Sequence, residues 1–265
     1  MTDITTSEDG TPIAYESAGA GPALVLVDGA LCHREFGPAR GLASALADRY
    51  TVYCYDRRDR GESGNTLPYG VDREIEDLKA VIDTAGGSAF VAGQSSGAGL
   101  AYRAAAAGVP MRALAGYESP WVGLRPNQDG TPRDYIGELK AFVLAGERGK
   151  AVDYFMTKMV GGPWFLPIMF RLMRKPWKQL RAVAHTLPYD AEVMGAQFAV
   201  PVEELARITV PTLVMGGGKS PANMLAAQRR IADAIPGSQH RILDGQTHEV
   251  AAGALAPVLA EFFGG

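Results

Sequence analysis

Short apolar runs alternate along most of the chain with longer segments that have helical spacing. Most of these runs are apolar at nearly every position, which is typical of strands buried on both faces of a sheet. The segment 11–17 alternates instead, as a half-buried strand does. The predicted strands lie at 11–17, 23–27, 51–55, 89–92, 112–117, 211–215 and 240–243.

Helical patterns occupy the segments between these runs. Alanine is a strong helix former, glycine pairs end helices, and Ser-Pro is a common start signal. Strand and helix in regular alternation are typical of crossover units, so we expect a mainly parallel sheet with helices on both faces. The helical signals are Ile75, Leu78 and Ile82 before Gly86-Gly87, the alanine-rich segment 96–107, the Ser220-Pro221 pair and the segment 256–263.

One long segment, 119–207, interrupts the alternation. It has helix-like sequence without a convincing strand, and it contains all three tryptophans and five of the nine methionines. We expect a helical cap over the carboxyl ends of the strands, where open α/β sheets bind ligands. Residues 1–118 and 208–265 would then form the core. The alternative is a second helical layer with its own hydrophobic core, since such stripes are more often core than ligand wall.

A Gly-x-Ser-x-Gly pattern, Gly93-Gln94-Ser95-Ser96-Gly97, lies between a predicted buried strand and the alanine-rich helix. In this context the serine occupies a sharp strand-to-helix turn, and small residues on either side of it prevent clashes. The helix N-terminus and the next backbone N–H then face the developing oxyanion. A glycine-rich turn without chemistry is the alternative, but the flanking strand and helix favour Ser95 as a nucleophile.

With three further segments, this motif resembles the α/β-hydrolase family over nearly the whole chain. The resemblance implies an eight-stranded, mainly parallel sheet with a helical cap. It also implies an oxyanion hole formed by the backbone N–H groups of Ala30 and Ser96. The three segments are Asp28-Gly29-Ala30 after a strand, residues 56–64 (DRRDRGESG), which are similar to the family's D-x-R-G-x-G loop, and residues 245–248 (GQTH), which are similar to its histidine loop.

His248 is the best placed of the four histidines to act as the base. A serine hydroxyl needs a base to take its proton, and histidine suits that task near neutral pH. His248 comes last in the chain, as the family order of serine, acid and histidine requires. His240 lies in a predicted strand, His185 belongs to the insertion, and His33 follows the oxyanion segment, where it could contact substrate.

The acid that orients the histidine departs from the family pattern. The family usually places it after the strand at 211–215, but the following segment, 216–221, has no carboxylate. Glu118 is the best replacement because it follows the strand at 112–117, which in the family's sheet neighbours the strand at 211–215. Some family members use this position. Asp244 is the second candidate, and the alternative role for Glu118 is an ion pair or a cap at a strand end.

Asp28 is a second departure from the family pattern. The family often has histidine at this place, beside the oxyanion hole. A carboxylate that pointed into the hole would disfavour the negative charge that develops there. We therefore expect the Asp28 side chain to turn away or to bond locally.

Composition and charge exclude several functions. Charged residues make up 21% of the chain and the net charge is −3, which favours neither nucleic acid nor an anionic membrane as a partner. The polar N-terminus has no signal-peptide pattern, and the two cysteines, Cys32 and Cys54, are expected to be free, so we expect a cytoplasmic protein. No H-E-x-x-H, C-x-x-C, phosphate-loop or dinucleotide motif is present, so we expect no metal and no cofactor.

The sequence thus predicts a serine hydrolase, monomeric or homodimeric, for a small to medium, largely apolar ester or lactone. Cofactor-free perhydrolysis, C–C bond hydrolysis and lyase chemistry use the same triad and remain alternatives. A protein that binds a small ligand without turnover is a further one. The residues expected to form the apolar wall of the substrate site are Leu31, Trp121, Phe155, Met159 and Trp164.

Overall fold

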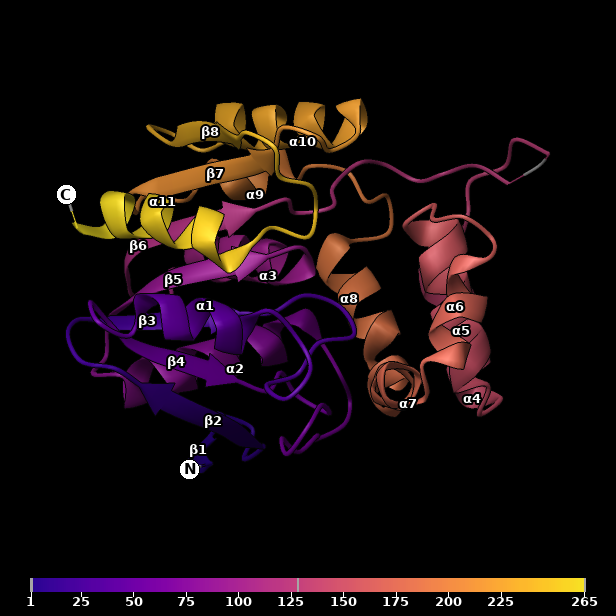
Figure 1. Cartoon of the computed structure of the whole chain (residues 1–265), viewed down its shortest axis with the longest axis horizontal. Coiled ribbons are helices and arrows are strands. Elements are labelled where there is room, and N and C mark those ends of the chain that lie inside the picture. Colours follow the sequence, from indigo (N-terminus) through magenta and orange to yellow (C-terminus); the bar gives the residue numbers. More distant parts are fainter. Residues whose placement is uncertain (1, 128, 265) are drawn as a thin grey trace.

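Eight strands form one sheet in the order β1-β2-β4-β3-β5-β6-β7-β8 (Figure 1). The computed structural model describes residues 2–127 and 129–264. β1 and β2 run antiparallel to their neighbours, and the other strands pair in parallel. The mainly parallel, eight-stranded sheet is therefore confirmed. The strands are β1 (Asp3–Thr6), β2 (Pro12–Ala18), β3 (Ala23–Val27), β4 (Thr51–Tyr55), β5 (Ala89–Gln94), β6 (Met111–Tyr117), β7 (Thr212–Gly217) and β8 (Gln239–Leu243).

The hydrophobic pattern does not predict β1. This strand is four residues long, and three of its side chains are exposed, so it has no apolar alternation. It pairs with β2 at the edge of the sheet through backbone hydrogen bonds, which need no particular side chain.

Helices cover both faces of the sheet, as expected. Along β3, Leu24 and Leu26 pack in the cluster that includes α1 and α11, whereas Val25 and Val27 pack in the cluster that includes α2 and α3. This arrangement explains why β3 is apolar at every position. The helices of the core are α1 (Ala39–Leu46), α2 (Val71–Thr84), α3 (Ser96–Ala106), α9 (Val202–Leu205), α10 (Ala222–Ala234) and α11 (Ala252–Gly264).

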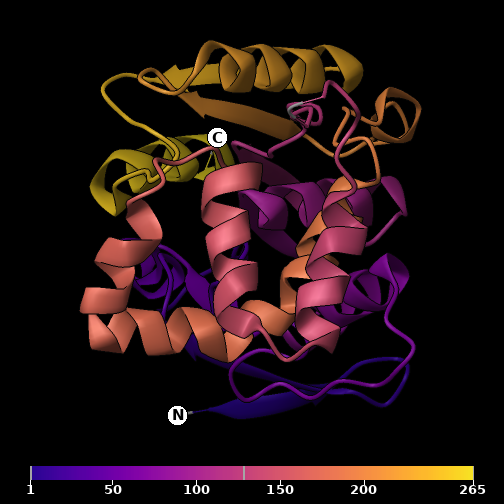
Figure 2. The same ribbon diagram turned by 90° about the vertical axis from the view of Figure 1, so that its right-hand side faces the viewer.

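The segment between β6 and α9 is a helical insertion. Its helices α4 to α7 lie to one side of the sheet in Figures 1 and 2, and α8 lies between them and the core. Helix α8 packs against α3 and α2. The insertion consists of α4 (Tyr135–Leu144), α5 (Arg148–Tyr154), a π-helical turn (Phe155–Met159), α6 (Leu166–Leu172), α7 (Arg174–Val183), a 3₁₀ turn (Ala184–Thr186) and α8 (Leu187–Met194).

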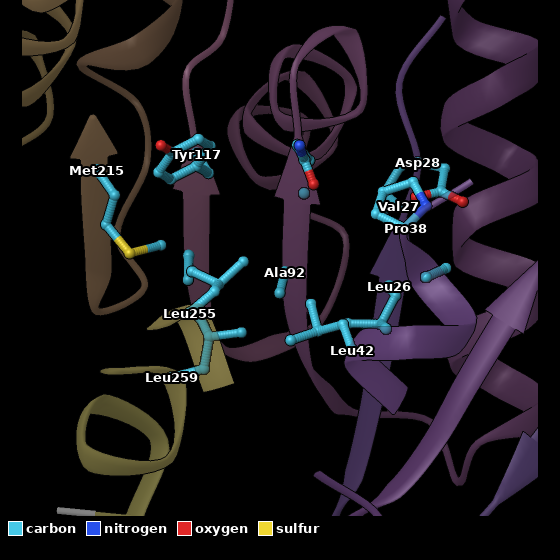
Figure 3. A pocket seen from close by; sticks show the side chains of 14 residues that line it. Leu26, Val27, Asp28, Pro38, Leu42, Ala92, Tyr117, Met215, Leu255 and Leu259 are labelled. Carbon is cyan, nitrogen blue, oxygen red and sulfur yellow. The ribbon is translucent and has the colours of Figure 1, made fainter. Parts of the chain in front are cut away.

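A small cavity lies where α1 and α11 pack against the sheet (Figure 3). Leu42, Leu255 and Leu259 supply much of its apolar wall, and Asp28 is the one charged residue among its described lining residues. The Asp28 carboxyl group lies against the start of α1, where the backbone N–H of Ala39 interacts with it. Asp28 therefore bonds locally, to the backbone at the start of α1, as we expected.

Burial raises the pKa of Asp28 to about 7, although Arg60, Arg57 and the Ala39 N–H act in the opposite direction. An aspartate in an unfolded chain has a pKa of about 3.9. Between these two values the folded protein holds a proton that the unfolded chain has released. The contribution of Asp28 therefore makes the wild type less stable as the pH rises from about 4 to about 7.

We predict that Asp28→Asn is more stable than the wild type at pH 8, by a few kcal/mol (roughly 1.4 kcal/mol for each pKa unit). The difference should be much smaller at pH 4, because Asp28 is protonated there in the folded chain and about half protonated in the unfolded chain. Urea unfolding at pH 4, 6 and 8 measures the difference. Asp48→Asn, at an exposed position, controls for the loss of one negative charge. A difference in stability that is the same at all three pH values would contradict a raised pKa for Asp28 in the folded protein.

Candidate active site

Ser95 lies in a strained turn between the end of β5 and the start of α3. Its φ of +57° is unusual for a residue with a side chain. The turn requires two glycines. A Cβ on Gly93 would lie 2.6 Å from the Ala98 Cα, and a Cβ on Gly97 would lie 2.2 Å from the Val27 carbonyl oxygen. The Gly-x-Ser-x-Gly pattern therefore follows from packing, and it presents the serine at the carboxyl end of the sheet.

Ser95, His248 and Glu118 form a continuous hydrogen-bonded chain. His248 Nε2 lies 3.1 Å from Ser95 Oγ, and His248 Nδ1 lies 2.8 Å from Glu118 Oε2. The carboxylate of Glu118 is fully buried, whereas the His248 side chain is 42% exposed. The structure thus brings together the three residues predicted to be catalytic, and it leaves the histidine partly accessible to solvent.

The carboxylate of Glu118 is bound from two sides. Its Oε1 accepts a hydrogen bond of 2.7 Å from the backbone N–H of Gly217, at the end of β7. Burial by itself would raise the pKa of Glu118, but the interactions with His248, the Ser220 hydroxyl and the Gly217 N–H hold it below its usual value. The group is therefore ionised at neutral pH and suited to orient an imidazole and to stabilise its protonated form.

Two further side chains hold the histidine loop in place, and the sequence analysis did not single them out. The Tyr117 hydroxyl donates to the Thr247 carbonyl, and the Gln94 amide donates to the His248 carbonyl at 3.2 Å. Each directly precedes a residue of the triad. Their position beside Ser95 and Glu118 is the one signal in the sequence that could have indicated this role.

The segments predicted to form the oxyanion hole lie beside Ser95. A Cβ on Gly29 would lie 2.8 Å from the Ser95 Cβ, so the peptide between Gly29 and Ala30 passes close to the nucleophile. Ser96 is the first residue of α3, where backbone N–H groups have no partner within the helix. Within the described residues, no hydrogen bond uses the backbone N–H of Ala30 or of Ser96. Both donors are therefore available to an oxyanion.

The five residues predicted to line the substrate site have very different surroundings. Leu31 is buried, and Phe155 and Met159 are half-buried against the core. Trp121 is 2% exposed and its indole N–H donates to the Met194 carbonyl, so its ring is a core element and offers no wall to a ligand. Trp164 is 76% exposed. For Leu31, Phe155, Met159 and Trp164, contact with substrate stays a prediction.

Among residues 2–127 and 129–264, no group of three or more histidine, cysteine, aspartate or glutamate side chains could hold a metal ion. None of the described helices is long and apolar enough to cross a membrane.

Comparison with known proteins places the chain in a family. Residues 19–253 match the model of the alpha/beta hydrolase family. The solved structure of an alpha/beta hydrolase from Sphaerobacter thermophilus is 49% identical, with a TM-score of 0.88, and the match covers 98% of this chain and 100% of that one. No curated protein matches the sequence.

Two more distant structures share the fold. An enol-lactonase from Burkholderia xenovorans is 20% identical with a TM-score of 0.74, over 99% of this chain and 100% of that one. A bromoperoxidase from Bacillus anthracis is 19% identical with the same TM-score, over the whole of both chains. From the family match over most of its length, the chain belongs to the alpha/beta hydrolase family.

Proposed function

We propose that the protein is a serine hydrolase that cleaves small to medium, largely apolar carboxylic esters or lactones through an acyl-enzyme. The observation that carries the proposal is the hydrogen-bonded chain from Ser95 through His248 to a buried, ionised Glu118. A nucleophile, a base and an orienting acid at hydrogen-bond distance are the arrangement that acyl transfer to serine needs.

In the first half of the reaction, Ser95 Oγ attacks the carbonyl carbon of the ester while His248 Nε2 takes the hydroxyl proton. The carbonyl oxygen becomes an oxyanion that accepts hydrogen bonds from the backbone N–H groups of Ala30 and Ser96. His248 then gives the proton to the alkoxide leaving group as the C–O bond breaks. The product is an alcohol, and the acyl group is bound to Ser95.

In the second half, water attacks the acyl carbon and His248 takes one of its protons. When the bond to Ser95 breaks, the same proton returns to Ser95 Oγ and the carboxylic acid leaves. Glu118 stays ionised throughout. It holds the His248 ring by the Nδ1–H group and stabilises the imidazolium that forms in each half.

The fold does not select this reaction among those that the triad permits. The two distant neighbours that share the fold are an enol-lactonase and a bromoperoxidase, so one fold carries different reactions. The same residues remain compatible with cofactor-free perhydrolysis, C–C bond hydrolysis or lyase chemistry. We favour the ester or lactone over perhydrolysis because its cleavage needs no reactant besides water, and over C–C bond hydrolysis because an alkoxide leaves more readily than a carbanion.

We predict that Ser95→Ala abolishes covalent labelling by a fluorophosphonate and lowers kcat on short p-nitrophenyl esters by roughly 10⁴- to 10⁶-fold. Intact mass measures the labelling, and steady-state kinetics measures turnover. Ser44→Ala, which removes an exposed hydroxyl, should behave as the wild type. If the wild type is neither labelled nor active on esters and lactones, the proposal fails and a ligand-binding protein becomes the better hypothesis.

We predict that Glu118→Gln lowers kcat by roughly 10²- to 10⁴-fold and changes KM by only a few-fold, because an amide neither orients the imidazole correctly nor stabilises its charge. Glu249→Gln, at an exposed position next to His248, is the matched control. Should Glu118→Gln keep the kcat of the wild type, Glu118 is not the acid, and Asp244→Asn is the variant to measure next.

A further inference from the structure

An arginine holds the peptide that carries one of the two oxyanion donors. Arg60 Nη1 donates a hydrogen bond of 2.7 Å to the Gly29 carbonyl oxygen. In a planar trans peptide, the carbonyl of one residue and the N–H of the next point in opposite directions. The direction of the Gly29 carbonyl therefore fixes the direction of the Ala30 N–H. The positive charge on the carbonyl side also polarises the peptide and strengthens the N–H as a donor.

The residue that carries the second donor is held through its side chain. The Ser96 hydroxyl donates a hydrogen bond of 2.7 Å to Asp190 Oδ1. The backbone N–H of the same serine is the other predicted oxyanion donor. A fixed side chain on the first residue of α3 limits the freedom of that N–H.

One carboxylate joins these two contacts. Asp190, on α8 of the insertion, accepts hydrogen bonds from Arg60 Nη2 at 2.8 Å and from Arg57 Nη1 at 2.7 Å, besides the one from Ser96. Arg57 also forms a bidentate pair with Glu74, with distances of 2.6 and 2.7 Å. The side chains of Arg57, Arg60, Glu74 and Asp190 are all buried. Two cations and two anions form a neutral cluster behind the oxyanion hole.

We propose that Asp190 is a positioning residue for the oxyanion hole, through which the helical insertion sets both backbone donors. Asp190 acts on Ala30 through Arg60 and on Ser96 directly. The inference rests on the proposed function, because it gives Ala30 and Ser96 their role. It also assigns a second task to the insertion: the donors are aligned when α8 is docked on the core.

A purely structural role explains the cluster less well. Burying charged groups costs several kcal/mol for each ion, and an apolar replacement of a buried ion pair is often as stable. Stability alone therefore does not call for ions at this place. The charge on Asp190 persists despite its burial, because Arg60 and Arg57 hold its pKa below the usual value. Fixed, ionised groups behind backbone donors are what electrostatic preorganisation requires.

Two variants test the proposal. Ser96→Ala removes the hydroxyl but keeps the backbone N–H, and we expect kcat to fall roughly 10-fold with KM within about twofold of the wild type. Asp190→Asn removes the charge that both arginines share, and we expect a loss of roughly 10²-fold in kcat. The matched control is Glu204→Gln. It breaks the ion pair between Arg103 of α3 and Glu204 of α9. Among the described residues, neither side chain forms a hydrogen bond with Gly29, Ala30 or Ser96.

The decisive readout is affinity for a trifluoromethyl ketone, which forms a tetrahedral oxyanion with a serine nucleophile. In Ser96→Ala and Asp190→Asn, its affinity should fall by about the same factor as kcat/KM, whereas Glu204→Gln should leave both unchanged. A merely structural role would instead lower the midpoint of thermal unfolding without this correlation. If Asp190→Asn fails to fold, the parallel loss of inhibitor affinity and kcat/KM in Ser96→Ala is the result that tests the proposal.

The outcomes separate the inference from the proposed function. A wild type that is neither labelled by a fluorophosphonate nor active on esters overturns the proposed function and this inference with it. A wild type that is labelled and active, with folded variants that keep its kcat and its inhibitor affinity, overturns only the inference. Parallel losses in kcat/KM and inhibitor affinity support both.

Discussion

Close packing of the backbone around Ser95 determines where the other groups of the site lie. The turn from β5 into α3 has no room for a side chain at Gly93 or Gly97, and β3 passes so close that position 29 must also be glycine. β5 lies between β3 and β6 in the sheet. The segment that carries Ala30 therefore emerges on one side of Ser95, and Glu118 emerges on the other.

The same strand order explains how the acid can come from β6. β6 and β7 are paired in parallel, and paired strands lie about 4.8 Å apart. The carboxylate of Glu118 extends from the end of β6 to the backbone N–H at the end of β7. A Cβ on Gly217 would lie 2.6 Å from the Gln246 carbonyl oxygen, so glycine there lets the histidine loop approach. Glu118 at the end of β6 thus reaches His248 from the neighbouring strand, and the segment after β7 needs no carboxylate of its own.

Local signals in the sequence predict the strands and the position of Ser95, because both depend on neighbouring residues. Glu118 and His248 lie 130 positions apart and are predicted through the resemblance to the family, which supplies the strand order and the histidine loop. Buried strands are continuous apolar runs, and the nucleophile has small residues at fixed distances. β1 escapes prediction because backbone pairing at a sheet edge leaves no pattern in its side chains. Trp121 shows a second limit: an aromatic residue in the insertion can face a ligand or the core, and composition does not tell which.

The buried cluster of Arg57, Arg60, Glu74 and Asp190 lies beyond sequence reasoning for a different reason. Asp190 is 94 positions from Ser96 and 130 from Arg60, and no local motif marks it. Arg57 and Arg60 lie in a loop that resembles the D-x-R-G-x-G loop of the family. Their contacts with Asp190 depend on how α8 packs against the core. The contacts of Asp190 therefore become visible only when the chain is folded.

The central claim is that Ser95 forms a covalent acyl intermediate. Its most direct test is to mix the wild type with p-nitrophenyl acetate, quench with acid within milliseconds, and map the digested peptides by mass. We predict one acetyl group on the peptide that contains Ser95, which forms in a burst together with one equivalent of nitrophenol. Turnover of the ester with no acetyl group on Ser95, or with the acetyl group on another residue, would contradict the account.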